Sequence, residues 1–116
     1  MAKGQAFAAS DHRHYNRDGQ AFNVGETFSG LPFEKGVELA DALRQSVPDG
    51  MTMADMAQRW ILDHEAVSTV ITGASRPDQA RANAAVSSLA PLPSELHERL
   101  AAFYQNEVAP HVRGPV

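Results

Sequence analysis

The feature that most restricts the possible folds of this chain is that a single segment has the character of a β-strand. Residues 67–72 are dense in β-branched side chains and end at Gly73. Because every hydrogen bond of a β-ladder needs a neighbouring strand, one strand cannot satisfy its own backbone. No internal repeat of about 20–50 residues supplies further strands. The chain therefore has the pattern of a piece of a larger helix–strand architecture.

Four segments with helical periodicity surround this strand. The sequence predicts the order helix, helix, strand, helix, helix, with the helices at about 32–46, 52–65, 76–88 and 94–107. Pro48-Asp49-Gly50 is expected to end the first helix with a turn. Capping boxes are expected at two helix starts, one from Thr52 and Asp55 and one from Ser75 and Asp78.

The burial of these helices can also be predicted. The second helix is expected to lie deep in the protein, because five apolar residues share one face: Met53, Met56, Ala57, Trp60 and Ile61. Ordinary solvated helix faces are expected for five charged residues: Asp41, Arg44, Asp63, Glu98 and Arg99.

The chain divides by composition into three parts. Residues 1–32 are rich in Gly, Asn, Asp, His and Arg and show no sustained period, which predicts a long irregular loop or lid. Residues 33–110 contain the periodic elements, and residues 111–116 form a tail that is expected to be loose. Asp11, His12 and His14 have side chains that bind metals, but Arg13 between the histidines would repel a cation, so solvated loop histidines are the preferred interpretation.

Composition excludes several classes of function. The 116 residues carry a formal net charge of −4, which argues against a nucleic-acid partner, since such binding needs a basic face. The absence of cysteine removes disulfides and thiolate metal sites. No apolar run approaches the roughly 20 residues of a membrane span, and no signal peptide is visible, so we expect a soluble, cytoplasmic chain with no membrane partner.

The turn between the strand and the third helix is the one place where the residues suggest chemistry. Gly73 permits close approach to the backbone, the free amides of the helix start face outward, and Arg76 adds a guanidinium group that suits a phosphate. Gln79 and Asn83 follow Arg76 on one side of the helix. These features predict an anion site. The alternative is a capped helix with Arg76 in solvent and Asn83 holding a neighbouring loop.

Three motifs in order resemble the C-terminal end of the aldo-keto reductase family. The motifs are Met53-Ala54-Asp55-Met56-Ala57-Gln58-Arg59-Trp60-Ile61-Leu62-Asp63-His64, then Val67 to Ala74, then Gln79 to Asn83. Leu92-Pro93-Ser94-Glu95-Leu96 is similar to the start of the family's final helix. The resemblance covers roughly residues 33–110, and it extends to the loop Phe7–Leu31 through Asp11-His12-Arg13 and Gly25–Gly30.

The resemblance implies a fold and a cofactor. It implies an α/β protein, the C-terminal part of a (β/α)8 TIM barrel that is incomplete on its own, and NADPH-dependent reduction of aldehydes or ketones by the complete enzyme. Such barrels hold phosphate in the loops after strands seven and eight. Six residues match the family's cofactor-binding positions, and the resemblance therefore implies that they hold NADP(H): Gly73, Ala74, Ser75, Arg76, Gln79 and Asn83.

The chain departs from the family pattern in two ways. Thr72 stands where the family usually has proline, and Ala82 replaces the usual glutamate before Asn83. No residue matches the family's catalytic Asp, Tyr, Lys and His, and Tyr15 lies in the irregular loop, so no catalytic residue is assigned. The partner implied for the complete enzyme is a small carbonyl substrate.

Two other interpretations of the chain stay open. One is a non-catalytic helical interaction module that pairs its strand with another chain. The other is a truncated, degenerate reading frame with an exposed apolar face. Both predict self-association through the strand and through apolar helix faces such as that of Trp60.

Overall fold

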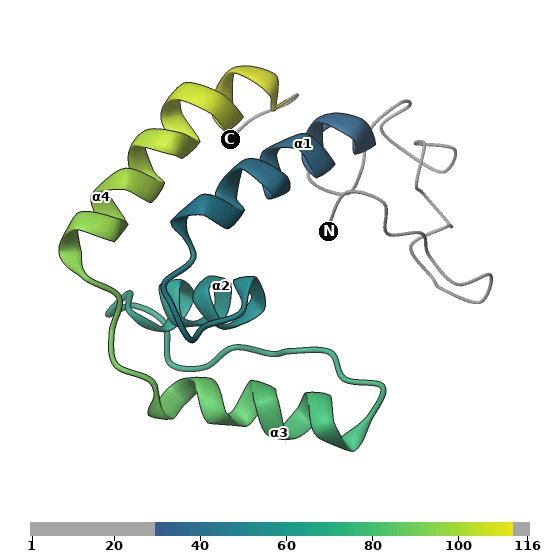
Figure 1. The fold of residues 1–116 in the computed structure, drawn as a ribbon, viewed down its shortest axis with the longest axis vertical. Coiled ribbons are helices and arrows are strands. Elements are labelled where there is room, and N and C mark those ends of the chain that lie inside the picture. The colour runs from purple at the N-terminus through teal and green to yellow at the C-terminus, as the bar shows by residue number, and fades with distance from the viewer. Residues whose placement is uncertain (1–29, 113–116) are drawn as a thin grey trace. The chain divides into compact units, whose positions relative to one another are not determined.

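The computed structural model describes residues 30–112, and all regular elements in that range are helices (Figure 1). The chain divides into two compact units, which are described separately. One unit is residues 46–100. Of the described residues, the other contains residues 30–45 and 101–112.

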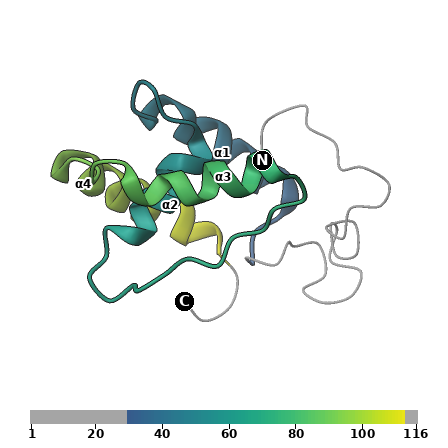
Figure 2. The same ribbon diagram turned by 90° about the horizontal axis from the view of Figure 1, so that it is seen from below.

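The predicted strand is the main correction to the sequence analysis. Residues 67–72 are extended between α2 (Met53–Leu62) and α3 (Pro77–Ala85), but they belong to no strand. Figures 1 and 2 show this connection running back alongside α3. Within residues 30–112, no second extended segment offers a ladder to pair with. The β-forming sequence therefore keeps an extended backbone without becoming a strand.

Helix α2 begins as the sequence predicts. The Asp55 N–H donates to Thr52 Oγ1 at 3.0 Å, and the Thr52 N–H donates to Asp55 Oδ2 at 2.9 Å, so the capping box is confirmed. The turn before it is confirmed as well. The Met51 N–H donates to the Pro48 carbonyl at 3.2 Å, and Gly50 has a φ of 81°, a left-handed conformation that a side chain would disfavour.

The core of the 46–100 unit joins α2 to the start of α4 (Ser94–Phe103). Met56, Leu92 and Leu96 are buried together, and four partly buried residues pack against them: Val47, Met51, Met53 and Leu100. These contacts tie two stretches of chain that are far apart in sequence, residues 47–56 and 92–100.

The predicted depth of α2 is only partly right. Met56 is buried, whereas Ala57 is exposed and Trp60 is 39% exposed. A helix buries only the residues that face another layer, and α2 packs through its Met53 and Met56 side onto Leu92 and Leu96. The periodicity indicates a broader apolar face that includes Ala57 and Trp60. Among the described residues, no other element buries this part of the face.

The third helix continues beyond its α-helical part. Its last turn is the 3₁₀ helix η3 (Val86–Ser88), where Val86 is 1% exposed, so the predicted end near Ser88 is confirmed. Helix α4 begins at Ser94 as expected, and a π-helical segment (Tyr104–Val108) and a 3₁₀ turn (Ala109–His111) extend it past the expected end.

The other unit contains helix α1 (Phe33–Leu43), followed by the 3₁₀ turn η2 (Arg44–Ser46), which lies across the boundary. Its bounds agree with the predicted helix at about 32–46, and Leu39 is its buried residue. Of the helices between residues 30 and 112, none is long and apolar enough to cross a bilayer.

Candidate functional site

The six predicted site residues occupy the turn before α3 and two positions along that helix, Gln79 and Asn83. Gly73 to Arg76 form the exposed turn, and Gln79 and Asn83 are partly buried on α3. Pro77 stands at the first position of the helix, where its missing N–H is not needed. The local sequence therefore places the turn and the start of α3 together, as the sequence analysis predicts.

The side chain of Gln79 accepts hydrogen bonds from three donors of the turn. Its Oε1 accepts from the Ser75 N–H at 2.8 Å, from Ser75 Oγ at 3.0 Å and from the Arg76 N–H at 3.2 Å. The helix cap is Arg76, and Gln79 closes the capping interaction three residues on. The predicted cap, Ser75 with Asp78, is therefore wrong. The longer amide side chain of Gln79 reaches both amides before the helix, and Asp78 bonds elsewhere.

Asp78 instead pairs with Arg76. Arg76 Nε lies 3.1 Å from Asp78 Oδ1, and both side chains are well exposed to solvent. The hydrogen bond from Arg76 lowers the pKa of the Asp78 carboxyl group, so this carboxylate is ionised at neutral pH. An exposed pair of this kind contributes little to stability. The guanidinium group can therefore exchange its partner at small cost.

The side chain of Asn83 links the turn to α2 and α3 by hydrogen bonds. Its Nδ2 donates to the Gly73 carbonyl at 3.1 Å, and its Oδ1 accepts from Gln58 Nε2 on α2 at 3.0 Å. This arrangement agrees with the alternative in which Asn83 holds a neighbouring loop. Gln79 and Asn83 both bond within the protein, and the guanidinium group of Arg76 bonds to Asp78 rather than to the side chain of either of them.

The backbone at Gly73 is open to approach. A Cβ atom added at Gly73 would meet nothing within 4 Å. Beside the turn lies a groove of about 270 Å³, with Gln58 and Leu62 of α2 on one side, Asn83 of α3 on the other and Val70 and Thr72 of the extended segment along it. The groove is somewhat smaller than typical small-molecule sites, which begin near about 300 Å³.

Comparison with known proteins assigns the chain to a family. The model of the aldo/keto reductase family matches residues 3–105, which is most of the sequence. The chain belongs to the aldo/keto reductase family. Comparisons with curated proteins and with solved structures find no match.

The family match confirms the resemblance that the motifs suggested, and it includes residues 3–32 ahead of the helices. The family is one of oxidoreductases with (β/α)8 barrels, and the described part of this member is helical. Between residues 30 and 112, no group of three or more His, Cys, Asp or Glu side chains is arranged to hold a metal. The Asp11, His12 and His14 cluster lies outside the described residues.

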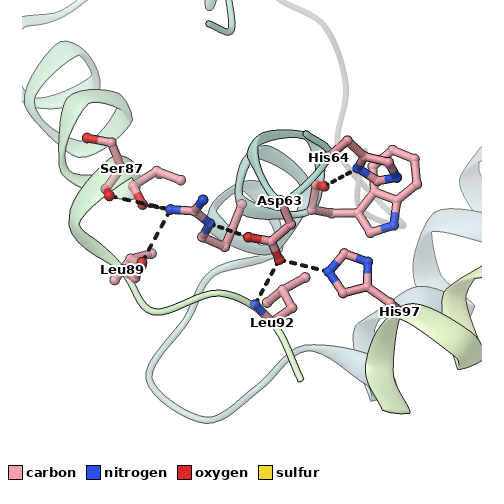
Figure 3. A network of polar contacts seen from close by, with 9 residues as sticks. Asp63, His64, Ser87, Leu89, Leu92 and His97 are labelled. Carbon is pink, nitrogen blue, oxygen red and sulfur yellow. Dashed lines mark hydrogen bonds and ion pairs between the residues drawn. The ribbon is translucent and has the colours of Figure 1, made fainter. Parts of the chain in front are cut away.

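A polar network that the sequence analysis did not predict holds α2 of this aldo/keto reductase chain against the residues that follow α3 (Figure 3). Asp63 lies at its centre with a side chain only 7% exposed. It accepts hydrogen bonds from Arg59 Nε, the Leu92 N–H and His97 Nε2, each at 2.8 Å. The expectation that Asp63 lies on a solvated face is therefore wrong, because its donors come from three separate places in the chain.

Arg59 extends the network to the end of η3. Its Nη1 donates to the carbonyls of Val86, Ser87 and Leu89 at 3.2–3.4 Å. These carbonyls lie at a helix end, where carbonyl groups often lack intrahelical donors, although the Val86 carbonyl also accepts from the Leu89 N–H at 3.1 Å. His64 adjoins the network: its Nδ1 lies 2.7 Å from the Trp60 carbonyl, and its ring meets the edge of His97 with centroids 5.9 Å apart. The Arg59–Asp63 pair has the spacing of four residues along one helix, but nothing in the sequence indicates that His97 and Leu92 join it.

Burial and hydrogen bonding act in opposite directions on Asp63. Burial alone raises the pKa of its carboxyl group, but the hydrogen bonds from His97, Leu92 and Arg59 and the charge of Arg59 together lower the pKa below 3.8. Asp63 is therefore ionised at neutral pH and serves as a structural acceptor. Its three donors link α2 to Leu92 and His97, and we assign it a structural role.

The lowered pKa of Asp63 predicts acid sensitivity. The unfolded chain takes up a proton at a higher pH than the folded chain does, so the stabilising contribution of Asp63 is complete above about pH 4 and is lost as the pH falls through the folded-state pKa. When the pH is lowered from 4, we expect the denaturant concentration at the unfolding midpoint to decrease more steeply in the wild type than in Asp63→Asn. Equal slopes for the two proteins would contradict the assignment.

Proposed function

We propose that the turn Gly73–Arg76 and the start of α3 bind the phosphate on the adenosine side of NADP(H), within an NADPH-dependent oxidoreductase that reduces aldehydes or ketones. In the complete enzyme the cofactor supplies the hydride. This chain supplies cofactor binding, and its 116 residues are under half of the roughly 250 that a barrel of this type needs. We therefore also propose that it corresponds to the C-terminal part of the barrel and does not catalyse the reduction alone.

The observation that carries this proposal is the convergence of three donors on one oxygen. The Ser75 N–H, the Ser75 hydroxyl and the Arg76 N–H all point at Gln79 Oε1. An oxygen atom that accepts three hydrogen bonds at the start of a helix occupies the position that a phosphate oxygen takes in an anion site. When the flexible side chain of Gln79 turns away, the same three donors face outward.

Two neighbouring features fit a phosphate as well. The Arg76 guanidinium is exposed beside these donors and can form two parallel hydrogen bonds with phosphate oxygens. The space around Gly73 allows a ligand to approach the backbone. Opposing them, Asp78 competes with phosphate for Arg76, since both are anions. Binding therefore requires that Arg76 leave Asp78 and that Gln79 leave the turn.

Protection of the chain by cofactor tests the proposal. We expect NADPH to raise the thermal midpoint of the wild-type chain in a concentration-dependent way, because ligand binding to the folded state shifts the equilibrium. NADH, which lacks the 2′-phosphate, should protect far less. Arg76→Ala should weaken the apparent NADPH affinity by about tenfold, the loss expected for one charge-assisted contact.

Arg81→Ala is the matched control. It removes an exposed arginine from the same helix, α3, at a position outside the turn. NADPH protection of Arg81→Ala should equal that of the wild type. Equal losses in both variants would indicate nonspecific attraction by positive charge, and absence of protection in the wild type would reject the proposed cofactor site for this chain.

A further inference from the structure

Two side-chain amides connect α2, α3 and the turn that precedes α3. Gln58 Nε2 on α2 donates to Asn83 Oδ1 on α3 at 3.0 Å, and Asn83 Nδ2 donates to the Gly73 carbonyl at 3.1 Å. All three residues belong to the 46–100 unit, and both amide side chains line the groove beside the turn. Among the described residues, Gln58 makes no hydrogen bond of its own to residues 73–76, so it can act on the turn only through Asn83.

The bond at Gly73 determines the direction of both amides. A backbone carbonyl can only accept hydrogen bonds, so Asn83 must direct its NH2 group at Gly73 and its oxygen toward Gln58. Gln58 then supplies a donor to that oxygen. If the Asn83 amide were reversed, its oxygen would face the Gly73 carbonyl and its NH2 group would face the NH2 group of Gln58. Gln58 therefore favours the one orientation in which Asn83 can bond to Gly73.

The Gly73 carbonyl lies at the start of the turn that carries the three donors described above. Ser75 and Arg76, whose N–H groups converge on Gln79 Oε1, follow it within three positions. Glycine has more backbone freedom than any other residue, and no atom lies within 4 Å of a Cβ position at Gly73 to restrain it by packing. The bond from Asn83 supplies a restraint at this point. A site whose donors are ordered before the ligand arrives loses less entropy on binding.

We propose that Gln58 is a positioning residue for the cofactor site: it orients Asn83, and Asn83 holds the Gly73 carbonyl and with it the turn of residues 73–76. This inference rests on the proposed function, because the turn is the segment proposed to bind the phosphate. It assigns Asn83 to the support of the site rather than to direct contact with NADP(H), since both ends of its amide are engaged within the protein.

A double-mutant cycle on the full 116-residue chain tests this role. Isothermal titration calorimetry measures the dissociation constant of NADPH for Gln58→Ala, Asn83→Ala and the double variant, at a temperature where circular dichroism shows that each is folded. Gln58→Ala should weaken NADPH binding by about three- to tenfold, the loss expected for one hydrogen bond. In the Asn83→Ala background the same change should have no further effect, because Gln58 acts through Asn83.

Gln45→Ala is the control for the cycle. It makes the same substitution at an exposed glutamine that lies outside the 46–100 unit. Its dissociation constant for NADPH should equal that of the wild type. Gln58 is only partly buried and alanine suits a helix interior, so Gln58→Ala should keep the helical circular dichroism of the wild type.

Hydrogen exchange gives a second measurement that does not involve the cofactor. The exchange rates of the Ser75 and Arg76 backbone amides are measured by NMR in the absence of NADPH. Both rates should be several-fold higher in Gln58→Ala than in the wild type, because the turn opens more often once the Gly73 carbonyl is less firmly held. Gln45→Ala should leave both rates unchanged.

The two measurements distinguish failure of this inference from failure of the proposed function. Unchanged exchange rates in Gln58→Ala would overturn the inference, and so would unchanged affinity in Gln58→Ala when the wild type binds NADPH. Equal losses from Gln58→Ala in both backgrounds would also overturn it, since a residue that only stabilises α2 acts regardless of Asn83. If the wild type bound no NADPH, the proposed function would be rejected, while faster exchange in Gln58→Ala would still support the positioning of the turn by Gln58.

Discussion

Replacing Asp63 with alanine is expected to lower the free energy of unfolding by about 3 kcal/mol or more, because it breaks a buried ion pair and leaves its donors unpaired. Asp63 has a side chain 7% exposed, and Arg59, its ion-pair partner, is 12% exposed. The Leu92 N–H and His97 would lose the same acceptor. Urea denaturation followed by circular dichroism measures the change.

Asp78→Ala is the matched control for Asp63→Ala. It also removes the carboxylate of an Arg–Asp ion pair, with a nitrogen–oxygen distance of 3.1 Å, but the pair is exposed to solvent. Its denaturation midpoint should stay at the wild-type value. If Asp63→Ala and Asp78→Ala were equally stable, the network around Asp63 would not be the link between α2 and the residues after α3.

Truncation of Leu96 should have the second large effect. Leu96 is 3% exposed and packs with Met56 and Leu92 at the centre of the 46–100 unit. Leu96→Ala should cost about 2–5 kcal/mol, since it removes buried apolar surface and leaves a cavity where α4 meets α2. Thermal unfolding of the purified variant, monitored by circular dichroism, measures the loss.

Leu96→Met is the control that distinguishes the effect of lost side-chain volume from the effect of any substitution at this position. The substitution keeps the side-chain volume close to that of leucine, so it should cost less than about 1.5 kcal/mol. Comparable losses in Leu96→Met and Leu96→Ala would show that the shape of the side chain at this contact, rather than the buried volume, determines stability.

The residues of the candidate site could be proposed from the sequence because they are neighbours along the chain. A glycine-containing turn, an arginine and a proline at the first position of a helix lie within a few residues of one another, and the structure places them together. The sequence did not predict how the site is closed. Asp78 was expected to cap the helix, but Gln79 has the reach to bond the amides of Ser75 and Arg76. Competition between neighbouring side chains for one donor depends on rotamers, which periodicity does not describe.

The sequence by itself determined the elements that depend on nearby residues. The capping box at Thr52, the turn at Gly50 and the bounds of α1, α2 and the third helix follow from hydrogen bonds and backbone preferences within a few positions. Only the tertiary structure decided which helix faces are covered, that Asp63 is buried, and that residues 67–72 remain without a ladder. Burial and strand pairing need atoms from distant parts of a chain, or from another chain. A β-forming sequence therefore becomes a strand only where a partner meets it.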